Sequence, residues 1–401
     1  MLKKINQCDI YVGMWCIYML QGVLYPSGII NRILQLIMLL WSMIAVFKFM
    51  IQSTGCSSIL KATFFLIVMY TVYGGIHIMF GEAIMMRDQY LYLQASLNSL
   101  APIFLFYDFA MNGKLTSDRI RIYLPILIVT CLLLFYKNES HVLLMTNKEE
   151  ITNNIGYMFV PLIPFLFFYS KKPILQYVFM GIIILYVFMA MKRGAILICV
   201  ISAMVLLFVN IKDSSRSTKF LFVILTIIII VGVSKYIVYM MDNSAYFMTR
   251  IEQTMDGDAS DRDVIYSKLW ETLLLESRPF YFYFGRGANS TLNIVGNGAH
   301  QDWLETFCNN GLIGVIILFF FFCVFGKNVW ESRQSFSGMM FYSFVTVFIV
   351  IFSKTFFSMS IQDLDLSESM LIGYFAYWTT QPIEEVEEQE MSDSLLESDQ
   401  I

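Results

Sequence analysis

The chain has 401 residues, of which 57% are hydrophobic and only 14% are charged, and its mean hydropathy is +0.64. A soluble domain of this size cannot carry so much apolar surface, so the composition excludes a soluble globular protein. The formal net charge of −4 arises from a run of acids near the C-terminus and does not describe the apolar body of the chain.

Apolar stretches approaching the 20 or so residues that a bilayer-crossing helix needs recur about twelve times. Lipid offers the backbone no hydrogen-bond partner, so we expect helices, and none of the stretches alternates as a membrane β-barrel does. The sequence therefore predicts an all-α, polytopic helical bundle of about 12 transmembrane helices with one large extracytoplasmic loop. The expected spans are 10–25, 33–51, 62–80, 94–110, 122–136, 155–169, 173–190, 195–211, 220–239, 310–326, 338–357 and 367–380.

Charge and hydropathy divide the chain into four regions. Basic residues favour cytoplasmic loops, and their distribution predicts that both termini are cytoplasmic. Lys3 and Lys4 precede the first apolar stretch without a cleavage site, which predicts an uncleaved start-transfer helix. The expected regions are an N-terminal transmembrane region of about nine spans (1–239), a large extracytoplasmic loop (240–309), a C-terminal transmembrane region of about three spans (310–380) and an acidic disordered cytoplasmic tail (381–401).

Cysteine and histidine spacing gives no metal-site pattern. The seven cysteines lie in or beside spans without a CxxC pair, and the three histidines are far apart. We expect no metal, no cofactor and no disulfide framework. Gly285-Arg286-Gly287 has neither a following Walker lysine nor a βαβ context, so we do not expect nucleotide or nucleic-acid binding.

Lys192 and Arg193 fall at the predicted outer end of the seventh span, against the distribution of the other bases. They either extend to the outer headgroups or form an anion site in a cavity open to the outside. Arg193 is the better candidate for an anion site, because a guanidinium binds phosphate in a bidentate manner and an ammonium does not.

The long loop is net acidic but contains three candidate arginines, Arg250, Arg262 and Arg286. Apolar residues recur at helical spacing after Arg262, which predicts an amphipathic helix on the membrane surface or over a cavity. The aromatic run Phe280–Phe284 suits interfacial anchoring or contact with sugars or lipid.

His300 begins a polar block that we expect to form the start of the tenth transmembrane helix. At about 100° per residue, His300 and Trp303 share the apolar arc, whereas Asp302 and Glu305 lie on another. Two interpretations stay open for His300, a hydrogen-bonded structural histidine or a catalytic group.

Taken together, these motifs resemble the O-antigen polymerase and ligase superfamily, and most closely the Wzy-type polymerases. The resemblance covers residues 190–326, and Gln301 stands where the family most often has Asn. It rests on Lys192-Arg193-Gly194-Ala195, Ser260-Asp261-Arg262, Phe284-Gly285-Arg286-Gly287, Ala299-His300-Gln301-Asp302-Trp303-Leu304-Glu305 and Gly311-Leu312-Ile313-Gly314.

The resemblance implies a membrane glycosyltransferase that joins polyprenyl-diphosphate-linked oligosaccharide repeat units at the outer face of the bacterial cytoplasmic membrane. A chain-length regulator protein is a further candidate partner. Guanidinium groups would stabilise the departing diphosphate, and His300 would take the proton of the acceptor hydroxyl. The implied catalytic residues are His300, Arg193 and Arg286, and the implied substrate-binding residues are Arg262, Arg250, Asp302, Trp303 and Glu305.

Two alternatives to a polymerase stay open. A ligase of the same superfamily would transfer the finished glycan to lipid A core or to protein. A flippase for lipid-linked oligosaccharides would more often show internal two-fold repeats with Gly/Pro-broken helices at matching positions, and the sequence shows no such repeats.

Overall fold

The structure is a computed structural model, and the described part of the chain is helical throughout its regular elements. It describes residues 4–24, 28–51, 57–80, 86–146, 153–213, 216–243, 248–249, 252, 262–275, 278–361 and 364–381.

The first half of the bundle contains α1 (Gln7–Leu24), α2 (Ile29–Ile51), α3 (Ser58–Phe80), α4 (Met86–Met111), α5 (Ser117–Thr146), α6 (Gly156–Phe159) and the 3₁₀ helix η1 (Val160–Tyr169). The second half contains α7 (Pro173–Met189), α8 (Arg193–Asp213), α9 (Arg216–Asn243), α11 (Arg262–Leu274), α12 (Pro279–Phe284), α13 (Ser290–Val295), α14 (Asp302–Ser332), α15 (Gly338–Phe357) and α16 (Leu366–Trp378).

The all-α, polytopic membrane class is confirmed. Each of the predicted apolar stretches falls on a helix of the structure. In the described part of the chain, seven helices are long and apolar enough to cross a membrane by length and composition, and two shorter apolar helices span 156–169 and 173–189. The number of about twelve crossings stays a prediction, as does the orientation of the termini. The acidic tail from 382 onward lies outside the described residues.

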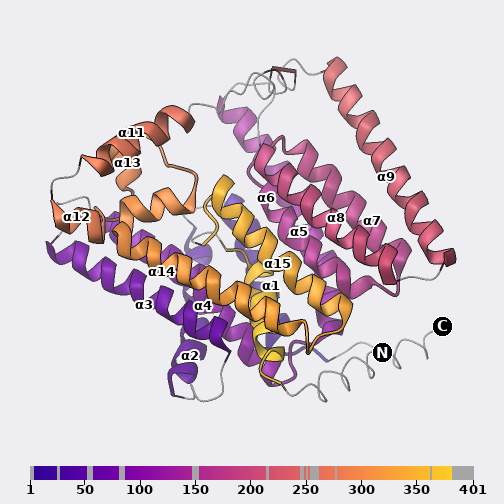
Figure 1. Cartoon of the computed structure of the whole chain (residues 1–401), viewed down its shortest axis with the longest axis horizontal. Coiled ribbons are helices and arrows are strands. Elements are labelled where there is room, and N and C mark those ends of the chain that lie inside the picture. Colours follow the sequence, from indigo (N-terminus) through magenta and orange to yellow (C-terminus); the bar gives the residue numbers. More distant parts are fainter. Residues whose placement is uncertain are drawn as a thin grey trace.

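The centre of the bundle is formed by α4, α16 and the α6–η1 segment. Residues 366–376 of α16 are buried without interruption, and so are residues 159–167. A helix that is buried on all sides needs no polar face, and the pattern of α16 has none. The periphery differs, because α9 lies apart at one edge of the bundle (Figure 1). Only 6% of the most apolar 18-residue stretch of α9 is buried.

The short helices α11, α12 and α13 gather at one end of the bundle beside the start of α14 (Figure 1). The helix predicted after Arg262 is confirmed as α11. Its predicted apolar face divides: Leu269 and Leu273 are buried with Leu304, whereas Val264 and Trp270 are exposed. Burial on one side and apolar exposure on the other suit a helix that lies at the membrane surface.

Helix α14 is broken at Gly311, whose φ of 69° and ψ of −170° are not helical. The break frees carbonyls that must find other donors inside the protein. The segment after α12 supplies them, because the amides of Arg286 and Gly287 donate to the carbonyls of Cys308 (2.9 Å) and Asn309 (3.0 Å). The part of α14 before the break starts inside the segment expected to be loop, and it fixes the residues around His300.

Gly311 should tolerate no side chain. A Cβ there would collide with the Tyr283 carbonyl, and the backbone conformation itself costs other residues roughly 1–3 kcal/mol. We expect Gly311→Ala to lower the thermal unfolding midpoint of the detergent-solubilised protein. Gly296→Ala is the matched control, because Gly296 also has a positive φ of 76° but has no neighbour within 4 Å. Equal midpoints for the two variants would contradict the close packing at the break.

Candidate functional site

A cavity of about 900 Å³ lies between α1, α2, α4 and the ends of α15 and α16. Three basic residues from separate connections line it: Lys192 between α7 and α8, Arg262 at the start of α11, and His300 before α14. We call these three residues the basic end. They are separated by 38 to 108 positions in the sequence, so only the fold brings them to one cavity.

Lys192 is placed by a tight turn that packs against two other segments. Met191 takes a positive φ of 53°, and the carbonyl of Ala190 accepts a hydrogen bond from the Asn153 amide at 2.9 Å. A Cβ at Gly194 would collide with Tyr157 and Phe357. The glycine therefore allows the start of α8 to approach the end of α15, which brings the turn to the cavity.

Arg262 reaches the C-terminal end of α15. Its Nη2 donates to the Phe357 carbonyl at 3.5 Å, and the Tyr157 hydroxyl donates to the same oxygen at 3.3 Å. The last carbonyls of a helix lack intrahelical partners and carry partial negative charge, so they attract a guanidinium. Arg262 also lines the cavity, where its charge can act on an anion.

His300 differs from the sequence prediction. The helix begins at Asp302, with Gln301 as its N-cap, so His300 precedes it. His300 has a positive φ of 52° and an exposed side chain. The expectation that it faces the protein on the apolar arc of the helix is wrong, because that argument started the helix at His300, two residues before it begins. The histidine is instead presented to the cavity.

Asp302 and Glu305 hold the backbone around His300. Oδ2 of Asp302 accepts hydrogen bonds from the amides of Ser360 (2.8 Å) and Ile361 (3.1 Å) in the connection between α15 and α16. Oε2 of Glu305 accepts from the Ala299 amide at 3.0 Å, directly before His300. Both side chains are buried, at 4% and 5% exposure, so they lie behind the cavity wall.

Trp303 connects α14 to α15. Its Nε1 donates to Thr355 Oγ1 at 3.0 Å, and its ring contacts those of Phe322 and Phe356. Three of the five residues expected to bind substrate, Asp302, Trp303 and Glu305, thus bind other parts of the chain and are not among the residues that line the cavity. Their position favours a role in fixing His300 and the end of α15.

The charges at the basic end affect His300. Partial removal of the ring from water lowers its pKa from the ordinary value of 6.5, and the positive charges of Arg262 and Lys192 lower it as well, against an opposing effect of Glu305. A lowered pKa means that the imidazole is neutral near pH 7. A neutral imidazole can accept a proton, which is what a general base must do.

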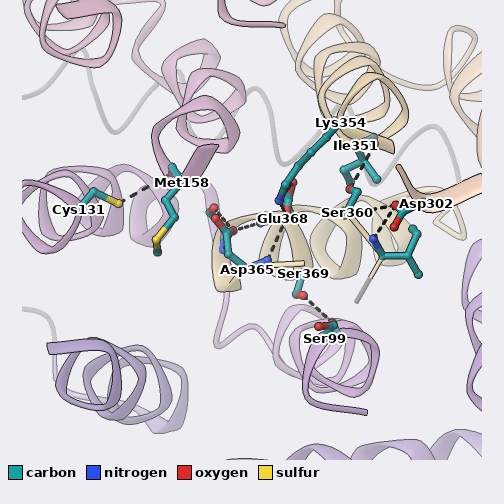
Figure 2. Close-up of polar contacts among 12 residues, drawn as sticks. Ser99, Cys131, Met158, Asp302, Ile351, Lys354, Ser360, Asp365, Glu368 and Ser369 are labelled. Atoms are coloured by element: carbon teal, nitrogen blue, oxygen red, sulfur yellow. Dashed lines mark hydrogen bonds and ion pairs between the residues drawn. The ribbon is translucent and has the colours of Figure 1, made fainter. Parts of the chain in front are cut away.

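A buried ion pair, whose Lys354 lines the cavity, was not anticipated from the sequence. Lys354 Nζ lies 3.3 Å from both carboxylate oxygens of Glu368, and the two side chains are 6% and 2% exposed (Figure 2). Asp365 caps α16 by accepting from the amides of Ser367 and Glu368. The sequence did offer a signal for this pair: Lys354 and Glu368 are charged residues within otherwise apolar stretches. Charged residues in membrane-spanning segments are rarely found without a function or a partner.

The remaining predicted arginines do not line the cavity. Arg193 begins α8 and is half-buried. Arg286 lies beside the α14 break, where its amide donates to the Cys308 carbonyl, and its guanidinium is 5.8 Å from the Tyr281 ring. Neither arginine is among the residues that line the cavity with His300. Arg250 lies outside the described residues.

The aromatic run Phe280–Phe284 is packed against protein. Phe280 contacts His77, Phe284 contacts Tyr73, and the Phe284 carbonyl lies 3.1 Å from His77 Nε2. These contacts attach α12 to α3. Among the described residues, no group of three or more His, Cys, Asp or Glu side chains is placed to hold a metal ion.

A comparison with known families finds one that part of the chain matches. Residues 178–319 match the O-antigen ligase family. The match confirms the resemblance to the O-antigen polymerase and ligase superfamily. Members of the matched family are membrane enzymes that transfer glycans. The matched region includes the whole basic end, and it ends before Lys354 and Asp365. No curated protein matches the chain.

The charge coupling at the basic end can be measured through the reactivity of His300 with diethyl pyrocarbonate, which modifies neutral imidazole. We expect the midpoint of this modification, followed by mass spectrometry against pH, to lie below 6.5. Arg262→Gln removes a positive charge that disfavours the imidazolium, so the midpoint should move to higher pH. Arg286→Gln is the control and should leave it in place. Equal shifts in both variants would contradict the geometry.

Asp302 should matter for stability. Asp302→Ala leaves two buried backbone amides without an acceptor, at a cost of about 1–3 kcal/mol. We expect a lower thermal unfolding midpoint for the solubilised protein. Asp108→Ala is the control, because Asp108 pairs with the exposed side chain of Lys48, and such pairs contribute about 1 kcal/mol or less. A midpoint for Asp302→Ala no lower than the control would show that the bond to the α15–α16 connection is unimportant.

Proposed function

We propose that the protein is a polymerase for a bacterial cell-surface polysaccharide such as O-antigen, capsule or exopolysaccharide. In this proposal it joins repeat units carried on polyprenyl diphosphate at the outer face of the cytoplasmic membrane, with both of its termini in the cytoplasm. The observation that carries the proposal is the convergence of Lys192, Arg262 and His300 on one cavity of a multi-pass membrane protein. The match of residues 178–319 to a glycan-transferring family supports it.

The transfer can be written with the residues of the basic end. The acceptor hydroxyl oxygen forms a bond to the anomeric carbon of the donor glycan, and the bond from that carbon to the diphosphate oxygen breaks. His300, neutral at pH 7, takes the hydroxyl proton. The electron pair leaves with the diphosphate, whose negative charge Arg262 and Lys192 stabilise. Arg193, next to Lys192 in the chain, is a further candidate for contact with the departing group.

A ligase is the second candidate function, because the description of the matched family is that of O-antigen ligases. Both functions need the same donor, a general base and a site for diphosphate, so the basic end suits either. They differ in the acceptor: a second lipid-linked repeat unit for the polymerase, and lipid A core or protein for the ligase.

Deletion of the gene in the producing bacterium distinguishes the two functions. Loss of a polymerase should leave acceptors that carry a single repeat unit. Loss of a ligase should instead leave long polymer on the polyprenyl lipid and none on the final acceptor. Accumulation of unexported repeat units at the cytoplasmic face would contradict both functions and favour a flippase. A chain-length regulator, if it is a partner, should alter the length distribution only when the polymerase is present.

Within the site, we expect His300→Ala to reduce polymer synthesis by about 10²- to 10⁴-fold, as loss of a positioned base does. Arg262→Lys should also abolish long chains, because one ammonium cannot replace a bidentate guanidinium. Arg286→Lys is the matched control, since Arg286 does not line the cavity, and this variant should retain long chains. Each variant must be present in the membrane at the parent level.

The polysaccharide ladder on a gel is the readout. Long chains from His300→Ala and Arg262→Lys would exclude the basic end as the site of transfer. Loss of long chains from Arg286→Lys alone would place the reaction near the break in α14, as the sequence motif first indicated.

A further inference from the structure

The cavity extends well beyond the basic end. Residues of α1 line it from Tyr11 to Met19, a distance of about 12 Å along the helix. Residues of α2 and α4 form its other walls, and none of these three helices belongs to the region that matches the family. We call this part of the cavity the inner arm.

The inner arm contains polar side chains whose hydrogen-bonding groups are unused by the described part of the chain. Trp15 is only 8% exposed, and its indole N–H has no partner among the described residues. The amides of Gln35 on α2 and Asn98 on α4 are half-buried, line the same cavity, and have no hydrogen bond to any described residue. Because all three side chains line the cavity, these donors and acceptors are available to a molecule bound there.

Asp365 adds a carboxylate to the same cavity. Its Oδ1 accepts hydrogen bonds from the amides of Ser367 (2.9 Å) and Glu368 (3.1 Å), which fixes the side chain at the start of α16. The residue also lines the cavity. The cavity therefore contains donors from Trp15, donors and acceptors from two amides, and an acidic acceptor held in place by its helix.

We propose that the inner arm is a saccharide-binding site that holds the sugar residues of a lipid-linked substrate while its reacting end lies at the basic end. This inference rests on the proposed function and specifies which walls recognise the glycan. Sugar hydroxyls are both donors and acceptors, and they match the amides of Gln35 and Asn98 as well as the Asp365 carboxylate. The Trp15 side chain provides an apolar surface with a polar N–H, which suits a sugar ring with its apolar faces and polar edges.

The main competing occupant is the prenyl chain. A hydrocarbon in the inner arm would leave two amides and an indole N–H without partners in a dry cavity, each at a cost of about 1–3 kcal/mol. The apolar side chains that line the cavity, such as Met38 and Leu39, pack equally well against the carbon faces of a sugar. The unused polar groups therefore favour a saccharide over a lipid tail.

The test compares binding of two lipids to the purified full-length protein in lipid nanodiscs, measured by native mass spectrometry. The probes are lipid-linked repeat units extracted from cells that lack the protein, and polyprenyl diphosphate without sugar. Asn98→Leu should weaken binding of the sugar-bearing lipid about tenfold, as loss of one or two hydrogen bonds does, and should leave binding of the bare lipid unchanged. Gln35→Leu, on a different helix, should have the same effect.

Gln94→Leu is the matched control, because Gln94 lies one turn before Asn98 on α4, is half-buried and does not line the cavity. It should bind both lipids as the parent does. Equal weakening of both lipids by Asn98→Leu and Gln35→Leu would assign the inner arm to the prenyl chain, and no weakening of either would show that no substrate occupies it. Either outcome overturns the inference.

Lipid binding by the parent protein distinguishes failure of this inference from failure of the proposed function. If it binds the sugar-bearing lipid and the variants bind it equally well, only the inner-arm assignment fails. If the parent binds no lipid-linked repeat unit, the proposed function fails together with the inference. A third probe, polyprenyl lipid that carries polymer, identifies which glycan occupies the inner arm. If the variants bind only the single-repeat lipid more weakly, the inner arm holds the acceptor. If they bind only the polymer-bearing lipid more weakly, it holds the donor. Both results support a saccharide site.

Discussion

Four carboxylates bound to backbone amides, three of them buried and that of Asp365 half-buried, hold the cavity together. Asp302, Glu305, Asp365 and Glu368 each accept a hydrogen bond from a backbone N–H in a segment that borders the cavity. A carboxylate removed from water requires such partners, since an unpaired charge in an apolar bundle costs several kcal/mol. Their combined effect is to fix the residues before α14 and the described residues of the connection between α15 and α16.

This arrangement accounts for the conformation of His300. A non-glycine residue with positive φ is strained and persists only where its surroundings determine it. Glu305 fixes the residue before His300, and Asp302 fixes the helix that follows it. The buried Lys354–Glu368 pair supports the opposite wall, and removing either partner would leave an uncompensated charge there. The basic end is thereby preorganised, which is what stabilisation of a departing anion requires.

Sequence reasoning predicted what depends on local pattern. Apolar length predicted the helices, and the spacing after Arg262 predicted α11, because both follow from the chain's own periodicity. It missed what depends on contacts between distant segments. Arg286 and Arg262 are equally plausible candidates in the sequence, and only the folded structure shows that Arg262 lines the cavity with His300 whereas Arg286 packs beside the break in α14. Asp365 carries no motif, and its place beside the cavity becomes visible only when α16 is seen at the centre of the bundle.

The region that matches the family includes one part of the cavity and excludes the other. The basic end lies within residues 178–319, whereas Trp15, Asn98 and Asp365 lie outside them. Diphosphate departure and proton transfer make the same demands whatever glycan is moved, so the groups that serve them can be shared across a family. Recognition of a particular sugar depends on which hydroxyls meet which donors and acceptors, and a site built to bind one hydroxyl discriminates strongly against a substrate that lacks it. In the proposed function, helices outside the matched region are therefore where differences in glycan specificity can arise without disturbing the transfer chemistry.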